Sequence, residues 1–100
     1  MLFLNSSVNN SLYTLNYENK IDISSYLTSG YTPNKNGIII VDFYHDTQIG
    51  FMSVIQNGIR TPFGAPANGT GGGQVIVNKN AKVTFETYSY DLTGYTITFI

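Results

Sequence analysis

The chain has 100 residues, enough for one domain with a single hydrophobic core. Cysteine is absent, which excludes disulfides, zinc–thiolate sites and thiol catalysis. The formal net charge is −1, so no long-range field would attract nucleic acid or anionic lipid. Only 11% of the residues are charged, and Asn, Ser and Thr must supply the polar surface. This composition favours an extracellular or virion protein over a cytosolic enzyme.

The start of the sequence, MLFLNSSVNN, becomes polar directly after a short apolar run. A secretory signal peptide needs a basic region and a longer apolar stretch, so we expect none here. No segment approaches the roughly 20 apolar residues of a membrane-spanning helix, so we expect no membrane insertion. We expect residues 1–20 to form an attachment arm or an edge strand, and residues 21–100 to form the folded domain.

The first half of the folded region predicts strands, because its apolar residues alternate or form β-branched runs without a helical period. Ile21 and Ile23 would share one face of a short strand, and a turn-rich connection follows. The strongest predicted strand is GIIIVDFYH, residues 37–45. Its apolar start indicates burial on both faces. Its later part alternates, with one face formed by Ile39, Val41 and Phe43 and the other by Ile40, Asp42 and Tyr44.

The segment FMSVIQNGIRTPF predicts a β-hairpin. Asn57-Gly58 is the dipeptide preferred in a type I′ turn, because both central residues of that turn need a positive φ. The flanking residues are apolar or uncharged polar side chains, with Val54 and Gln56 before the turn and Ile59 and Thr61 after it.

The glycine-rich segment FGAPANGTGGGQ, residues 63–74, resembles a phosphate-binding loop only superficially. A Walker A loop needs a lysine after its last glycine, and a dinucleotide fingerprint opens a helix. Here Thr70 follows Gly69, no lysine is present, and the next residues, QVIV, predict a short strand. We therefore interpret residues 63–74 as a long exposed loop, a common place for partner contacts. Its predicted contact residues are Asn68, Thr70 and Gln74.

The last two predicted strands are KVTFETYSY and YTITFI, in which apolar residues alternate. Val83, Phe85 and Thr87 share a face of the first, and Tyr95, Ile97 and Phe99 share a face of the second. Tyrosine combines contact area with a polar tip, which suits recognition of sugars or proteins. The predicted aromatic binding face comprises Tyr88, Tyr90 and Tyr95. The alternative for these residues is a half-buried sheet face or a subunit interface.

Catalysis finds little support in the sequence. His45 and Asp46 are the candidates for catalysis or metal binding, because histidine is the usual general base near neutral pH. The sequence contains no G-x-S-x-G nucleophile elbow to support this hypothesis. We interpret them as a polar strand end and a surface turn, and we also consider residues 45–50 a contact loop. We predict no enzyme activity, no catalytic or metal-binding residues and no cofactor. A hydrolase using His45 is kept as a third hypothesis.

The order of elements in this chain is distinctive. It runs from IDISSYLTSGYTPNKNGIIIVDF through SVIQNGIRTPF and a glycine-rich loop to QVIVNKNAKVTFETY and a closing YTITFI. In this order, the stretch from Asp22 to Ile100 resembles the small jelly-roll-like β-sandwich domains at the ends of bacteriophage fibres. Asn57-Gly58 matches their Ile-Asn-Gly turn, and Gly37–Val41 matches their first core strand. The chain departs from them at Asn80-Ala81, where Gly-Asp is usual. Trimeric jelly rolls of the tumour-necrosis-factor type have a similar order.

The resemblance implies an all-β antiparallel sandwich or jelly roll, usually trimeric, and the spacing of turns fits about seven to nine short strands. A small, weakly charged sandwich without cysteine would also gain stability by burying one face against other copies. The implied function is structural: a head-fibre, decoration or tail-fibre-tip subunit located in the virion. Its implied partners are copies of itself, other virion proteins and a host-surface glycan or protein, but not nucleic acid. The alternative function is a stand-alone carbohydrate-binding module.

Overall fold

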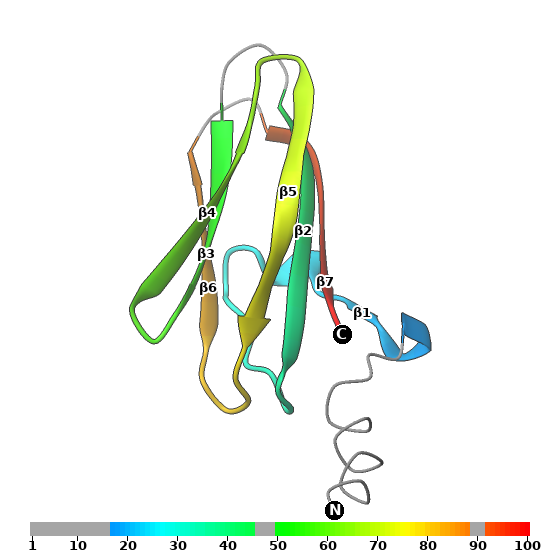
Figure 1. Ribbon diagram of the computed structural model, residues 1–100, viewed down its shortest axis with the longest axis vertical. Coiled ribbons are helices and arrows are strands. Elements are labelled where there is room, and N and C mark those ends of the chain that lie inside the picture. Colours follow the sequence, from blue (N-terminus) through cyan, green and yellow to red (C-terminus); the bar gives the residue numbers. More distant parts are fainter. Residues whose placement is uncertain (1–16, 46–49, 89–91) are drawn as a thin grey trace, which may run out of the picture.

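The computed structural model describes residues 17–45, 50–88 and 92–100, and these form an all-β fold of two antiparallel sheets, consistent with a β-sandwich (Figure 1). The strands are β1 (Ile21–Asp22), β2 (Gly37–His45), β3 (Gly50–Gln56), β4 (Ile59–Ala65), β5 (Gly69–Val77), β6 (Val83–Tyr88) and β7 (Leu92–Phe99). Within the described ranges the helical elements are two short 3₁₀ turns, η1 (Tyr17–Asn19) and η2 (Ser24–Tyr26). The prediction of an all-β fold is confirmed for these described residues.

The strand order is β1-β7-β2-β5 in the four-stranded sheet and β4-β3-β6 in the three-stranded sheet. Among the described strands, chain neighbours therefore pair only in the β3–β4 hairpin, and the other pairings join strands that are distant in sequence. An isolated antiparallel bridge also joins Tyr31 to Val83, the first residue of β6. The two residues exchange backbone hydrogen bonds of 2.8 and 2.7 Å. Tyr31 thus extends the three-stranded sheet beyond β6.

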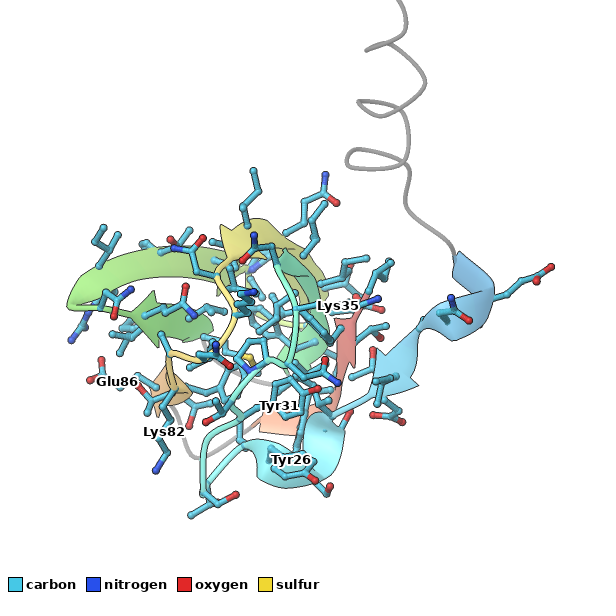
Figure 2. The ribbon with its side chains drawn as sticks, turned by 90° about the horizontal axis from the view of Figure 1, so that it is seen from below. Tyr26, Tyr31, Lys35, Lys82 and Glu86 are labelled. Atoms are coloured by element: carbon cyan, nitrogen blue, oxygen red, sulfur yellow. The ribbon has the colours of Figure 1, made fainter. Side chains whose placement is uncertain are left out.

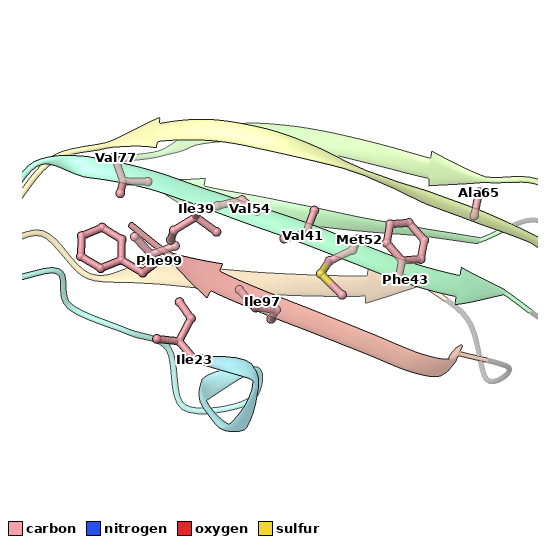
Figure 3. Packing of buried hydrophobic residues seen from close by; sticks show 11 residues of the cluster. Ile23, Ile39, Val41, Phe43, Met52, Val54, Ala65, Val77, Ile97 and Phe99 are labelled. Atoms are coloured by element: carbon pink, nitrogen blue, oxygen red, sulfur yellow. The ribbon is translucent and has the colours of Figure 1, made fainter. Parts of the chain in front are cut away.

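The core lies between the two sheets and follows the predicted alternation (Figure 3). On β2, Ile39, Val41 and Phe43 are at most 2% exposed, while Asp42 and Tyr44 face solvent. The apolar start of this strand is not buried on both faces, because Ile38 and Ile40 are only half-buried. The other fully buried apolar side chains come from both sheets and from the segment after β1: Ile23, Met52, Val54, Val77, Val83, Ile97 and Phe99.

The predicted hairpin is confirmed. β3 and β4 pair from Gln56 opposite Ile59 back to Gly50 opposite Ala65. Asn57 and Gly58 connect them with φ values of 52° and 78°, the positive values that a type I′ turn requires.

The glycine-rich segment is a strand and not a long loop, which corrects the prediction for residues 63–74. β4 continues to Ala65, and β5 begins at Gly69 and pairs with β2 along its whole length. Only residues 66–68 form a turn, in which Asn68 has a φ of 54° and the Gly69 amide donates to the Pro66 carbonyl over 3.1 Å. Strand propensity disfavours glycine, and here the long pairing with β2 overrides it.

The glycines of β5 allow close backbone approaches. A Cβ on Gly71 would collide with the carbonyl oxygen of Gly64, so β4 and β5 can meet at this level only without side chains. A Cβ on Gly73 would collide with the ring of Phe63. From this meeting point β4 and β5 diverge toward the β3–β4 turn, and the two sheets separate along that side (Figure 1).

The lower end of the sandwich is closed by aromatic rings (Figure 2). Tyr31 packs between Tyr26 and Phe99, with ring centroids 5.2 and 5.5 Å away. Burial raises the pKa of the Tyr31 phenol above its ordinary value, and the nearby Tyr26 raises it further. The Lys35 ammonium lies 5.8 Å from the centre of the Phe99 ring, within the range of a cation–π contact. These contacts hold the segment between β1 and β2 against the core.

Candidate functional site

A shallow, open depression lies on the outer face of the four-stranded sheet. It is lined by residues 40–42 of β2 and residues 70–74 of β5. Two of the predicted contact residues, Thr70 and Gln74, are brought together here, and both are exposed. We call this surface the glycine-floored depression.

Gly72 makes the floor of this depression. It lies opposite Asp42, has a φ of 155°, and a Cβ on it would collide with the carbonyl oxygen of Val41. The outer face therefore has no side chain at this position, while Thr70 and Gln74 project on either side of it along β5. The result is a flat backbone surface between polar side chains.

Asp42 and Tyr44 add a carboxylate and an aromatic ring to the same face of the sheet. Asp42 lies between Gly72 on β5 and Thr96 on β7, and all three are exposed. Tyr44 lies between Thr70 and Gly94, and its side chain is 38% exposed. Neither neighbour is large enough to cover the ring. A Cβ placed on Gly94 would meet no atom within 4 Å, so the space over Gly94, the cross-strand neighbour of Tyr44, is open.

The other predicted site residues lie elsewhere. Asn68 is exposed in the turn between β4 and β5. Tyr88 ends β6 in the three-stranded sheet, opposite Phe51, whereas Tyr95 lies on β7 in the four-stranded sheet, opposite the buried Phe43. Tyr90 lies outside the described residues.

Asp42 and Tyr44 were not predicted as site residues, although the alternation of β2 places them on one face of the strand. The missing information was the register. Only the pairing of β2 with β5 and β7 places Gly72 beside Asp42 and Gly94 beside Tyr44.

A second surface, the β4–β5 groove, lies where the two sheets separate. Its volume is about 120 Å³. It is lined by uncharged described residues, which are Val54, Gln56, Asn57, Ile59, Thr61, Val75, Ile76, Val77 and Asn78. Ile59 and Ile76 are 71% and 78% exposed, although isoleucine is among the residue types most often buried in proteins. The groove therefore combines an apolar floor with two exposed isoleucines.

The glycine-floored depression and the β4–β5 groove are both surfaces suited to binding. Among the described residues, no group of three or more His, Asp or Glu side chains is placed to hold a metal ion. His45 ends β2, but its side chain is outside the described set, and Asp46 is outside it altogether, so the His45 hypothesis stays a prediction. In the described ranges, no helix has the length and apolar character required to cross a membrane.

Comparison with known proteins identifies no relative. No protein-family model matches the chain, and neither the curated proteins nor the solved structures contain a significant match.

Proposed function

We propose that this chain is a jelly-roll module that works by assembly and binding, as a structural subunit of a bacteriophage particle. The fold part of the proposal is supported by the strand pairings. A jelly roll is a long hairpin rolled into two sheets, so that with eight strands the first pairs with the eighth, the second with the seventh, the third with the sixth and the fourth with the fifth.

Each of these pairings has a counterpart in the chain when Tyr31 is counted as the second strand. β1 pairs with β7, Tyr31 with β6, β2 with β5, and β3 with β4. This correspondence supports the jelly roll that the sequence resemblance implies. Jelly rolls recur in viral capsids and in lectins, so the fold agrees with a virion role without selecting it over carbohydrate binding.

The observation that carries the assembly proposal is the β4–β5 groove with its two exposed isoleucines. Interfaces between subunits are depleted of charge at their centre and bury apolar side chains. The groove's 120 Å³ is close to the roughly 150 Å³ of a cavity that accepts benzene, so it can receive one apolar side chain. Ile76 of a second copy, the most exposed large apolar side chain among the described residues, is suited to fill it.

Ile76 itself lines the groove, so each copy carries the groove and the isoleucine on one patch. Such a patch can meet the same patch of its neighbours around a symmetry axis, which is two-fold in a dimer and central in a closed ring. A closed ring of three copies is the assembly that we propose, in agreement with the trimer implied by the resemblance.

Light scattering on purified protein tests the assembly. We expect a mass of about three times the 11.0 kDa of the chain. Ile59→Lys and Ile76→Lys place a charge in the contact and should shift the mass to that of one chain. Ile21→Lys is the matched control, because Ile21 is also exposed but lies on β1, at the opposite edge of the four-stranded sheet. A wild-type chain that stays monomeric at every concentration would contradict the proposal.

The virion role is tested separately, by mass spectrometry of purified particles from a host that carries the gene. We expect peptides of this chain in the particles at a constant ratio to the major capsid protein. Particles that lack the chain while the cell lysate contains it would contradict the role.

A stand-alone carbohydrate-binding module is the second candidate function, and the glycine-floored depression favours it. An exposed tyrosine beside a threonine hydroxyl and a carboxylate, with an amide farther along the same face, is a set of side chains that can recognise a sugar. The two functions differ in their gene neighbours: capsid and tail genes support the virion subunit, whereas glycosidase genes support the module.

A further inference from the structure

On the outer face of the four-stranded sheet, polar side chains surround a position that has no side chain of its own, Gly72. Gly72 lies directly opposite Asp42, and Thr70 and Gln74 are the next outward positions on the same strand. Diagonal neighbours across a sheet are about 7–8 Å apart. Asp42 is therefore within reach of both side chains, with an unoccupied backbone surface between them where a small ring can lie.

The polar groups suit a ligand with several neighbouring hydroxyls. A carboxylate accepts hydrogen bonds on both oxygens, a glutamine amide both donates and accepts, and a threonine hydroxyl can do either. Hydrogen bonds to an ionised acceptor are the strongest of these. Asp42 can hold two adjacent hydroxyls, while Gln74 and Thr70 hold further groups on either side.

Tyr44 adds an apolar surface at one end of this set. Its cross-strand neighbours, Thr70 and Gly94, are small and Tyr44 is 38% exposed, so a flat partner can lie against its ring. The negative face of an aromatic ring attracts the weakly positive hydrogens at the edge or face of a partner. The C–H face of a sugar ring is such a partner, and its hydroxyls would then point along the sheet toward Asp42.

The charge of the surface sets the class of sugar. Asp42 is the charged residue among those lining the depression, and the described lining residues include no lysine or arginine. An anionic sugar would bring a second negative charge beside Asp42 without a cation to offset it.

We propose that the glycine-floored depression binds a neutral sugar unit, with Tyr44 against the ring face and Asp42 accepting hydrogen bonds from two adjacent hydroxyls. This inference rests on the proposed binding function and names the ligand class for its host-surface contact. It does not depend on self-association, because the β4–β5 groove uses the other half of β5.

The test is an NMR titration of the full chain with neutral oligosaccharides that contain hexoses or N-acetylhexosamines, and in parallel with sialylated and uronic-acid sugars. Concentrations up to about 10 mM would saturate a site with a dissociation constant near 1 mM. We expect at least one neutral sugar to shift the backbone amides of residues 42–44 and 70–74, and anionic sugars to bind at least about 10-fold more weakly.

Variants of the two central residues complete the test. Tyr44→Ala and Asp42→Asn should each raise the dissociation constant at least about 10-fold, as expected for losing a ring contact or a charged hydrogen-bond acceptor. Tyr26→Ala and Glu86→Gln are matched controls, because Tyr26 belongs to η2 and Glu86 to the three-stranded sheet. Both controls should bind the sugar as the wild type does.

Three results would overturn the inference: no amide shift with any neutral sugar, shifts centred on other residues, or equal binding by Tyr44→Ala and the wild type. Light scattering on the same samples separates this outcome from failure of the assembly. A trimer that binds no sugar refutes the sugar site alone, and a monomer that binds sugar through Tyr44 refutes the assembly alone.

Discussion

At the scale of single residues, glycine has three distinct roles in this chain. Gly58 supplies a positive φ in the β3–β4 turn, with no atom near the position of a Cβ. Gly71 allows the backbones of β4 and β5 to approach each other closely. Gly72 combines both requirements, because its φ of 155° disfavours a side chain and a Cβ would collide with β2. The same residue type therefore has very different costs of substitution along one sequence.

Substitution of Gly72 tests this difference. Gly72→Ala should lower the free energy of unfolding by about 2–4 kcal/mol, through backbone strain and the collision with the Val41 carbonyl. Gly94→Ala is the matched control on the same face of the same sheet, where a Cβ meets nothing within 4 Å. It should be neutral or stabilise by up to about 1 kcal/mol. Urea unfolding measures both, and equal loss in the two variants would contradict the explanation.

At the scale of elements, the side-chain amide of Gln56 at the end of β3 binds the connection between β5 and β6, which runs from one sheet to the other. The Gln56 side chain donates to the carbonyls of Asn78 and Ala81 over 2.8 and 3.0 Å and accepts from the Asn78 amide over 2.9 Å. It thereby holds the connection between β5 and β6 against the end of β3. This connection is further held by the Lys79 amide, which donates to the Asn36 side chain over 2.9 Å.

Loss of the Gln56 amide should therefore destabilise the whole sandwich. Gln56→Ala should lower the free energy of unfolding by about 1–3 kcal/mol, since three backbone groups lose their partner. Gln56→Glu should be at least as harmful at neutral pH, because a carboxylate cannot donate to the two carbonyls. Gln74→Ala, at an exposed glutamine of β5, should change stability by less than about 0.5 kcal/mol. Urea unfolding that shows Gln56→Ala and Gln74→Ala to be equivalent would refute this role.

The elements also show which parts of the fold could be predicted from the sequence. The β3–β4 hairpin was predictable because Asn57-Gly58 encodes its turn locally, and β2 because its apolar alternation encodes one buried face. The start of β5 was not predictable. Its glycines have low strand propensity, and their positions make sense only beside Gly64, Phe63 and Val41, which are close in space. The depression was predicted only in part for the same reason. Thr70 and Gln74 were identified, but placing Asp42 and Tyr44 beside them required the register of the strands.

At the scale of the whole molecule, β5 divides its length between two surfaces. Its glycine-rich first half forms the floor of the depression, and its β-branched end, from Val75 to Val77, lines the β4–β5 groove. The change in composition within one strand thus separates a polar surface from an apolar one. Ile76 is the next outward position on β5 after Gln74, so the two surfaces adjoin there. Gly72 and Thr70 lie farther along the strand, so a contact through Ile76 leaves that end of the depression accessible.

The low charge of the molecule leads to a prediction about salt. Only 11% of the residues are charged, and the groove is lined by uncharged described residues, so attraction between charges should contribute little to self-association. Between about 0.01 M and about 1 M NaCl the Debye length falls from about 30 to about 3 Å. We expect the dissociation constant of the assembly, measured by sedimentation across this range, to rise by less than about 3-fold. An assembly held by ion pairs would weaken far more over the same range of salt. Such a result would indicate that the interface lies at the charged surface around Arg60 and Glu86. These two residues form an exposed salt bridge on the three-stranded sheet. The variant Arg60→Gln separates the two cases, because it should leave the groove-based assembly intact and should dissociate one that depends on that surface.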